Sequence, residues 1–479
     1  MRSSFGEKNE GGGRFHARIS RARHARIEYS RDISTPLPDL ISAASSFAAM
    51  RSFTRACVSF ALYLYVEPSR GLRTSGGSAI VRSRVPHGAR QWTSTPTSRV
   101  HMSAGLKDGD IFWAKELRKG MHYRQLGKSD LVVSEVCLGT MTWGEQNSDE
   151  EAFDQLNLAY DEFGVNFIDA AEIYPVPTKK ETQGRTEIAL GKWLKTRTRE
   201  NVIVASKVAG RSDRLTYLRD SGEGTRVRRK DIVEAVDKSL KRLGTDYIDL
   251  LQIHWPDRHV PLFGSNERYD IMKERDDDIP FEEQLAAFDE VVRAGKVRFI
   301  GTSNDTPYGV VKMAQIGERM GYPRVASVQN NYSLLVRSDT ELGTMPEAVS
   351  RQNADVGFLA YSPLAGGVLT GKYESPGEPL PDARLNLFQG FMNRYRNTDS
   401  AKAVRKYAEI ADMIGLTPTQ LALAWVYSRE FITSTIIGAT NLVQLRDNLR
   451  ALNCPVTQPA YEAIQNVYDE FRDPTKEKR

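Results

Sequence analysis

The chain has 479 residues, with 66 Lys and Arg against 61 Asp and Glu, and 40% of its residues are hydrophobic. The positive charge is unevenly spread, because residues 1–105 carry 16 basic and six acidic side chains and the remainder is mildly acidic. A nucleic-acid-binding surface is therefore not indicated, since the excess charge lies in one tail. The three cysteines, Cys57, Cys137 and Cys454, exclude a disulfide framework and favour a reducing compartment.

Residues 1–105 have the composition of a targeting segment. They hold 15 Arg but a single Lys, together with 17 Ser, and show no sustained apolar periodicity. Such amino termini are typical of organelle transit peptides, so we predict a disordered transit leader here. The one apolar run, Ala56–Val66, is about half of the roughly 20 residues that a membrane helix needs, and no membrane span is predicted. Alternatively, part of this leader is not translated, because Met102 and Met121 are both possible starts.

Residues 121–475 are predicted to form one domain. The segment His122–Val133 indicates two short strands around a Gly-Lys-Ser-Asp turn, which predicts a β-hairpin. Eight short apolar runs follow, at 133–141, 165–171, 202–208, 248–254, 297–304, 326–332, 357–363 and 434–440. Between them lie amphipathic segments that predict helices, among them 150–163, 231–243, 281–294, 400–414 and 419–428. Ser148 and Thr417 stand where the first and the last of these helices should start.

Apolar strands separated by helices imply a parallel sheet that is covered by helices. Eight such units favour an α/β fold of the closed (β/α)₈ TIM-barrel type over an open doubly wound sheet. In such a barrel the chemistry gathers where the strands end. The polar and glycine residues at the predicted strand ends are Asp169, Lys207, His254, Ser303, Asn304, Gln329, Tyr361, Ser362, Gly438 and Thr440. Any one of them alone is more often a loop ion pair or a core residue, but their joint placement favours a site.

Four side chains near these strand ends form a plausible catalytic group. Asp169 and Tyr174 flank the turn after the second strand, Lys207 ends the third strand and His254 ends the fourth. A buried Lys lowers the pKa of a neighbouring Tyr, and a carboxylate keeps the Lys charged. A Tyr tuned in this way can donate a proton to a developing alkoxide, and a His can hydrogen-bond the same oxygen. The set needs a hydride donor, and a nicotinamide is the obvious one.

Eight segments occur in a recognisable order. They are LGTMTWGEQ (138–146), NFIDAAEIYP (166–175), VASKV (204–208), DYIDLLQIHWPDR (246–258), GKVRFIGTSN (295–304), VQNNYSLL (328–335), LAYSPLAGGVLTGKY (359–373) and TIIGATNLVQLRDN (435–448). A chain with these segments resembles the aldo-keto reductase family, in its Tas-like branch with plant plastid relatives. The resemblance implies an NADPH-dependent reductase of an aldehyde or ketone, with Asp169, Tyr174, Lys207 and His254 as the catalytic tetrad.

The resemblance also implies how a nicotinamide cofactor is held. Ser303, Asn304 and Gln329 would hydrogen-bond the carboxamide, and Tyr361 would stack on the ring. The full implied set of cofactor residues is Thr140, Met141, Gln146, Asp169, Ser303, Asn304, Gln329, Tyr361, Ser362, Leu364, Gly366, Lys372, Arg384, Gly438, Thr440, Gln444, Asp447 and Asn448. No GxGxxG turn follows the first strand, but this family's barrel does not use one.

Lys372 and Arg384 favour NADPH over NADH. They lie in the loop after the seventh strand, where the related potassium-channel β subunits contact the cofactor phosphate, and a 2′-phosphate needs cations. The alternative is that both are solvated loop charges. A position that is basic in the vertebrate steroid-type members is Gly438 here, so that mode of phosphate binding is not expected. The family resemblance favours a chloroplast, with the mitochondrion, or the cytoplasm for an untranslated leader, as alternatives.

Several other features bear on the substrate. Trp143 and Trp255 flank the predicted site and are candidates for substrate contact. Two long loops, Gly210–Val227 and His259–Ile279, are expected to cap the mouth of the site and to shape the pocket. His259 has no convergent carboxylate at metal spacing, so no metal site is predicted.

Two other functions stay open. One is a nicotinamide-binding regulator like the channel β subunits, although that group commonly has Asn where this chain has His254. The other is a lyase in which Lys207 forms a Schiff base. The partner expected of a reductase is a small carbonyl compound. The sequence indicates neither which compound this is nor the oligomeric state.

Overall fold

The computed structural model describes residues 120–261, 263, 269–374 and 380–476, so the predicted transit leader lies outside the described residues. Within them, eight parallel strands form a closed barrel in the order β10-β3-β4-β5-β6-β7-β8-β9. The strands are β3 (Val136–Gly139), β4 (Phe167–Asp169), β5 (Ile203–Val208), β6 (Ile248–Ile253), β7 (Val297–Ser303), β8 (Val325–Asn331), β9 (Gly357–Tyr361) and β10 (Ile432–Ile437). Each falls in or largely overlaps a predicted apolar run, so the (β/α)₈ barrel is confirmed.

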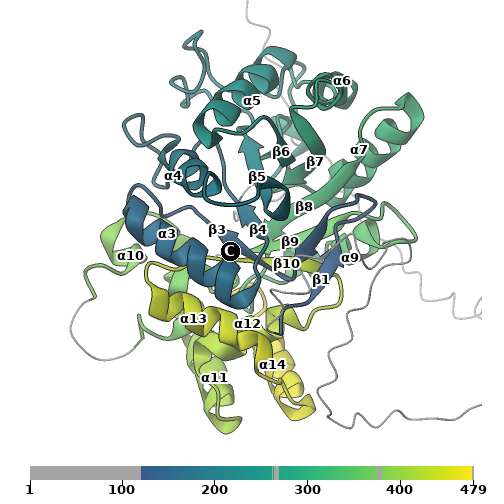
Figure 1. The fold of residues 1–479 in the computed structure, drawn as a ribbon. Helices are drawn as coiled ribbons and strands as arrows, with labels where there is room; N and C mark the ends of the chain where they lie inside the picture. Colours follow the sequence, from purple (N-terminus) through teal and green to yellow (C-terminus); the bar gives the residue numbers. More distant parts are fainter. Residues whose placement is uncertain (1–119, 262, 264–268, 375–379, 477–479) are drawn as a thin grey trace, which may run out of the picture. The chain divides into compact units, whose positions relative to one another are not determined.

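Helices surround the barrel (Figure 1). The longer ones are α3 (Asp149–Asn157), α4 (Arg185–Leu194), α5 (Arg229–Leu243), α6 (Phe281–Arg293), α7 (Pro307–Met320), α11 (Thr398–Met413), α12 (Pro418–Tyr427), α13 (Leu442–Arg450) and α14 (Gln458–Glu470). The short ones are α8 (Ser338–Glu341), α9 (Met345–Val349) and α10 (Arg384–Leu387). Helices α3, α5, α6, α11 and α12 confirm the five predicted segments, and a π-helical turn, Leu158–Glu162, continues α3.

The predicted helix starts are capped as expected. The Ser148 hydroxyl accepts a hydrogen bond from the Glu151 backbone N–H, and the Glu151 carboxylate accepts one from the Ser148 N–H, which forms a capping box on α3. Thr417 and Gln420 make the same reciprocal pair on α12, whose first residue is a proline. These pairs satisfy backbone donors that a helix cannot satisfy itself.

A hairpin precedes the barrel, as predicted. Strand β1 (Tyr123–Gln125) pairs antiparallel with β2 (Val132–Ser134). Leu126, Leu131 and Val133 of this hairpin belong to the apolar cluster inside the barrel, together with strand residues such as Phe167 and Leu250. The hairpin therefore closes the end at which the strands begin and leaves the opposite, carboxyl-terminal end free for a site. No helix in the described ranges is both long enough and apolar enough to cross a bilayer.

The turn of the hairpin makes a close contact that only a glycine allows. Gly127 has a φ of +53°, and a Cβ atom there would lie 2.7 Å from the carbonyl oxygens of Ala326 and Asp355. Gly295 also has a positive φ, +72°, but nothing lies within 4 Å of its Cβ position. Substitutions at these two glycines therefore distinguish the cost of a left-handed backbone from the cost of atomic crowding.

We expect Gly127→Ala to destabilise the protein more than Gly295→Ala does. A left-handed backbone costs an alanine about 1–2 kcal/mol at either position. The contacts at Gly127 add an overpacking cost of about 1–3 kcal/mol. Urea unfolding of both variants and the wild type measures the difference, and equal losses of unfolding free energy would show that the hairpin is not held against the barrel.

Candidate functional site

A cavity of about 830 Å³ opens where the barrel strands end. It brings together most of the residues that the sequence predicted for the site. Those that line it are Thr140, Met141, Asp169, Tyr174, His254, Trp255, Ser303, Asn304, Gln329, Tyr361, Ser362, Leu364, Gly366, Lys372, Arg384, Gly438, Thr440, Gln444, Asp447 and Asn448. Lys207 lies behind this wall, and Gln146 and Trp143 do not line the cavity.

Lys207 is the buried cation on which the site is built. Lys207 is the residue before the last of β5 and is 1% exposed. Its Nζ atom donates to the Asp169 Oδ2 atom at 2.6 Å and to the Ala170 carbonyl oxygen at 2.8 Å. Burial lowers the pKa of Lys207. The charge of Asp169 and the neighbouring Tyr174 together raise this pKa by a larger amount, so the net shift is upward. Lys207 is therefore an ammonium ion at neutral pH, as the ion pair requires.

Asp169 is held in place from its other side. Its Oδ1 atom accepts hydrogen bonds from the side-chain amides of Gln329 at 2.8 Å and Gln252 at 3.3 Å. The carboxylate is thus oriented by groups from β5, β6 and β8, which a closed barrel brings to one level. Gln252 was not predicted. Gln252 lies on β6, two residues before His254, which directly follows that strand. The alternation of side chains along a strand could have placed Gln252 and His254 on the same face.

Tyr174 lies against this ion pair. Its hydroxyl is 3.5 Å from the Lys207 Nζ atom, and its side chain is buried. Burial raises the pKa of Tyr174 above its usual value, and this outweighs the lowering by Lys207. The expected lowering of this pKa is therefore not found, because burial raises the pKa by more than Lys207 lowers it, and Asp169 adds to the rise. Tyr174 is protonated at neutral pH, which is the form that can donate a proton.

His254 completes the group beside Tyr174. The two rings are 5.6 Å apart and nearly perpendicular, with an interplanar angle of 81°. Burial and, second, the charge of Lys207 lower the pKa of His254 well below its usual value. The ring is therefore neutral at neutral pH. Among the described residues, its buried Nδ1 atom has no hydrogen-bond partner.

The predicted nicotinamide residues form one hydrogen-bonded cluster. The Asn304 side-chain amide donates to the His254 carbonyl oxygen at 2.9 Å and accepts from the Tyr361 hydroxyl at 2.6 Å. The Ser303 hydroxyl donates to the Gln329 carbonyl oxygen at 2.8 Å. Asn304 has a φ of +53°, a conformation that Asn tolerates and that occurs often at functional sites. These bonds hold it at the end of β7, facing the cavity.

The cavity wall also carries positive charge. Lys372 and Arg384 both line it, with Arg384 at the start of α10. Burial lowers the pKa of Lys372, and repulsion by Arg384 lowers it further; burial also lowers the pKa of Arg384. A bound anion would offset both effects. Arg394, which the sequence analysis missed, adds a third cation to the cavity wall.

Helix α13 begins beside the same cavity. Its cap, Asn441, accepts a hydrogen bond from the Gln444 N–H at 2.9 Å, and the Gln444 side chain accepts from the Thr440 N–H at 3.1 Å. The Asn448 amide donates to the Gly438 carbonyl oxygen at 3.2 Å. The four predicted residues of this region, Thr440, Gln444, Asp447 and Asn448, all line the cavity near a helix amino terminus, which favours an anion.

Three expected contributors to the site do not line this cavity. Trp143 is fully buried in the core, and its indole N–H donates to Gln155 at 3.1 Å, so it packs the fold and cannot contact substrate. Gln146 lines a separate hollow near the start of α3 instead of the cavity. No residue of the loop Gly210–Val227 lines the cavity, and Leu215, Tyr217 and Leu218 pack instead in the apolar cluster that contains Tyr174 and Trp255. From the loop His259–Ile279, Phe263 lines the cavity as expected.

The profile of the Aldo/keto reductase family matches residues 135–469. Protein tas of Escherichia coli (strain K12) is 42% identical over 362 residues, which cover 74% of this chain and 99% of that protein. The uncharacterized oxidoreductase YrpG of Bacillus subtilis is 30% identical over 355 residues, which cover 73% and 96% of the two chains. A probable voltage-gated potassium channel subunit beta of Arabidopsis thaliana is 31% identical over 337 residues, which cover 70% and 92%.

The chain therefore belongs to the aldo/keto reductase family, and its similarity to Tas places it in the Tas-like branch that the sequence predicted. The family and the relatives named as oxidoreductases support an oxidoreductase activity. Aldo-keto reductases generally use NAD(P)H, and Ser303, Asn304 and Gln329 line the same cavity as the cations Lys372 and Arg384.

The lowered pKa of His254 predicts a pH-dependent stability. In the unfolded chain this His is protonated below pH 6.5, whereas in the folded chain it stays neutral. The contribution of His254 to the free energy of unfolding is therefore fully present above that pH and is lost as the pH falls. Between pH 7.5 and 5.5 the wild type should lose on the order of 1 kcal/mol through this group. We expect His254→Asn to remove that part of the loss.

Urea unfolding of both proteins at the two pH values measures this effect. The difference between wild type and variant isolates His254, because other titrating groups contribute to both. An identical pH dependence in the two proteins would mean that His254 is protonated as readily in the folded chain as in the unfolded one.

Proposed function

We propose that the protein reduces an aldehyde or ketone, with NADPH as the hydride donor and Tyr174 as the proton donor. One observation carries the proposal: the Tyr174 hydroxyl is held 3.5 Å from the buried Lys207 ammonium group, beside a neutral His254. This arrangement places the Tyr174 proton at one point of the cavity. The charge of Lys207 stabilises the phenolate that forms when the proton leaves.

The residues of the chain then have distinct tasks. When bound, the nicotinamide supplies the hydride. As the carbonyl oxygen gains negative charge, Tyr174 donates its proton to it, and the neutral ring of His254 is placed to hydrogen-bond the same oxygen. Lys207 stabilises the resulting phenolate, and Asp169 keeps Lys207 charged and in position. Ser303, Asn304 and Gln329 hold the carboxamide, as the resemblance implies, so that the ring faces this point.

The proposed preference for NADPH rests on two cations that line the cavity. Lys372 and Arg384 are partly buried there, and both have lowered pKa values. Two neighbouring cations removed from water favour a doubly charged anion, and the 2′-phosphate is the group that NADH lacks. We assign the 2′-phosphate to this pair. The alternative of fully solvated loop charges is not supported by their burial.

The wall around Tyr174 favours an apolar substrate. Ile173, Val176, Met141 and Trp255 line this part of the cavity, and all four belong to or pack on one apolar cluster with Tyr174. A carbonyl compound would therefore place its oxygen at Tyr174 and an uncharged apolar body against these side chains.

The alternative functions have less support. In the lyase, Lys207 would have to be a neutral nucleophile, but its ion pair with Asp169 raises its pKa. The regulatory function of a channel β subunit shares the cofactor site, yet His254 is present and lies beside Tyr174. The Arg- and Ser-rich composition of residues 1–105 supports import into an organelle, and the resemblance to plant plastid relatives favours a chloroplast.

We expect Tyr174→Phe to abolish most of the carbonyl reduction and to leave NADPH binding intact. The variant keeps the ring but removes the proton donor, which should lower kcat by about 10²- to 10⁴-fold. Stopped-flow oxidation of NADPH at saturating cofactor measures the rate, and quenching of protein fluorescence measures NADPH binding. Tyr407→Phe is the matched control, because its buried hydroxyl bonds the Leu334 carbonyl oxygen outside the cavity. More than about a tenth of wild-type turnover in Tyr174→Phe would refute the proton-donor role.

Arg384→Ala should weaken NADPH binding by about ten- to a hundredfold, the value of one charge-assisted contact, and leave NADH nearly unchanged. Arg384→Lys should recover part of the loss. Leu387→Ala, an exposed position on the same short helix, controls for a disturbed loop. Titration of each variant with both cofactors gives the ratio of Kd values. An equal loss for NADPH and NADH would place the 2′-phosphate elsewhere.

A further inference from the structure

The loop after β5 contains a buried ion network. The Arg219 guanidinium donates from Nη1 to the Glu172 Oε2 atom at 2.7 Å and from Nη2 to the Glu172 Oε1 atom at 2.8 Å. Its Nε atom lies 3.3 Å from the Asp231 Oδ1 atom. All three side chains are about 1% exposed. A two-pronged guanidinium–carboxylate contact fixes distance and orientation together.

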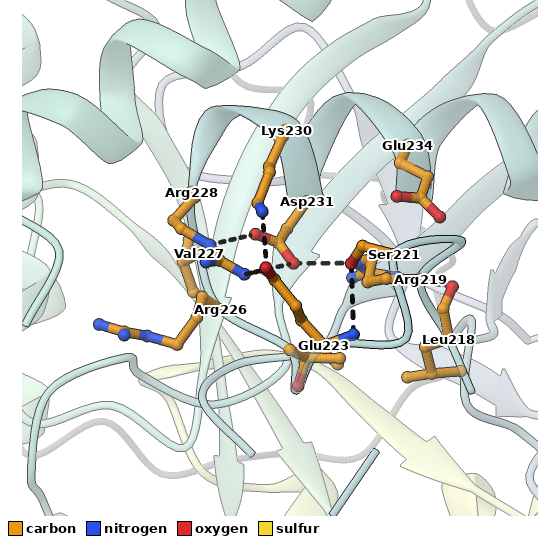
Figure 2. Close-up of polar contacts among 12 residues, drawn as sticks. Leu218, Arg219, Ser221, Glu223, Arg226, Val227, Arg228, Lys230, Asp231 and Glu234 are labelled. Carbon is orange, nitrogen blue, oxygen red and sulfur yellow. Dashed lines mark hydrogen bonds and ion pairs between the residues drawn. The ribbon is translucent and has the colours of Figure 1, made fainter. Parts of the chain in front are cut away.

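The network ties this loop to helix α5. Asp231 lies in the first turn of α5 and also accepts a hydrogen bond from the Arg228 Nε atom at 2.7 Å. Arg228 and Lys230 in turn pair with Glu223 at 3.2 Å and 2.7 Å, and Figure 2 shows the chain of contacts from Arg219 through Asp231 to Arg228. Arg219 is therefore held by a helix of the barrel and not by a free loop.

The other end of the network reaches the segment that carries Tyr174. Glu172 lies between Asp169 and Tyr174, two residues before the proposed proton donor. Its Oε1 atom accepts the Ala209 N–H at 2.7 Å, and its own N–H donates to the Lys207 carbonyl oxygen at 3.2 Å. The turn from Asp169 to Tyr174 is thus fixed at its start by Lys207 and near its end by Arg219.

The same loop also supports Tyr174 with apolar contacts. Leu218, the neighbour of Arg219, is buried in one cluster with Tyr174, Ile173 and Trp255. The Trp255 indole N–H donates to the Arg211 carbonyl oxygen at 2.9 Å, and a Cβ atom at Gly210 would overlap the Trp255 backbone. The loop therefore backs the residues of the substrate wall from outside the cavity.

We infer that Arg219 is a positioning residue for Tyr174, acting through Glu172. This inference rests on the proposed function. Burying one Arg with two carboxylates contributes little to stability compared with apolar side chains of similar volume, so stability alone does not explain the network. Its geometric effect is the placement of the Asp169–Tyr174 turn, and a shift of about 1 Å at a reacting group can cost about a hundredfold in rate.

The test compares Arg219→Met and Arg219→Lys with the wild type. Arg219→Met removes both hydrogen bonds to the Glu172 carboxylate and should lower kcat by about ten- to a hundredfold. KM for the carbonyl compound and Kd for NADPH should stay within about twofold of the wild-type values. Arg219→Lys keeps the positive charge but not the paired hydrogen bonds of the guanidinium group. It should lower kcat less, by about three- to tenfold. Hydride transfer is followed as NADPH oxidation in a single turnover, per folded molecule.

Arg199→Met is the matched control. Arg199 pairs with the nearly buried Asp249 at 2.7 Å, beside the strand starts of β5 and β6 at the opposite end of the barrel. We expect Arg199→Met to lower the thermal stability as well, because it removes one of the two guanidinium partners of the buried Asp249 carboxylate, which keeps Arg298 at 2.7 Å. The kcat of Arg199→Met should stay within about twofold of wild type, since nothing near Tyr174 changes.

A double-mutant cycle separates positioning from general damage. If Arg219 acts through Tyr174, adding Arg219→Met to Tyr174→Phe should lower kcat by less than about a further threefold, because the proton donor is already absent. Full additivity in the cycle, or a wild-type kcat in Arg219→Met, would overturn the inference and leave the proposed function intact. If Arg219→Met does not fold, Arg219→Lys decides, and a kcat within twofold of wild type overturns the inference. No NADPH-dependent turnover by the wild type would instead overturn the proposed function and the role of Arg219 with it.

Discussion

The ion pair between Lys207 and Asp169 is the interaction on which the rest of the site depends. Its two side chains are almost fully removed from water, and each has a further hydrogen bond: Asp169 accepts one from the Gln329 side-chain amide, and Lys207 donates one to the Ala170 carbonyl oxygen. A buried charge is tolerated only when it is paired and hydrogen-bonded in this way. The positive charge of Lys207 helps to keep the His254 ring neutral, and it lies where a Tyr174 phenolate would need stabilisation. One buried cation thus affects two of the groups that we place in the reaction.

The closed barrel explains how this group assembles from distant parts of the chain. Asp169 and Gln329 are 160 residues apart in sequence, yet their side chains meet because β4 and β8 end at the same level of the barrel. The fold could be predicted because apolar runs and helical periods repeat eight times, and strand ends could be recognised as the places where Asp, Lys and His interrupt apolar sequence. Most of the predicted residues therefore line one cavity.

What the sequence did not predict depends on contacts between irregular segments. Trp143 and Trp255 both follow barrel strands, but Trp143 turns into the core to reach Gln155, and only Trp255 lines the cavity. The pKa of Tyr174 depends on the balance between burial and a cation that Asp169 already neutralises, which residue order does not give. The Arg219–Glu172 contact joins two loops whose lengths and composition contain no periodic signal. Gln252 is the exception, because alternation along its strand could have indicated it.

The cavity wall carries both cationic and apolar side chains, and this combination limits what can occupy it. Lys372 and Arg384 line the cavity partly withdrawn from water, while Ile173 and other apolar side chains surround Tyr174. A charged group of a substrate would have to give up its hydration against these apolar side chains, whereas a phosphate gains two cations at Lys372 and Arg384. A molecule with an anionic group at one extremity and an uncharged ring at the other fits this distribution, and a dinucleotide whose nicotinamide ring lies near Tyr174 has this form. In the proposed reaction, the phosphate is assigned to the two cations, and the apolar wall beside Tyr174 is left to the carbonyl compound.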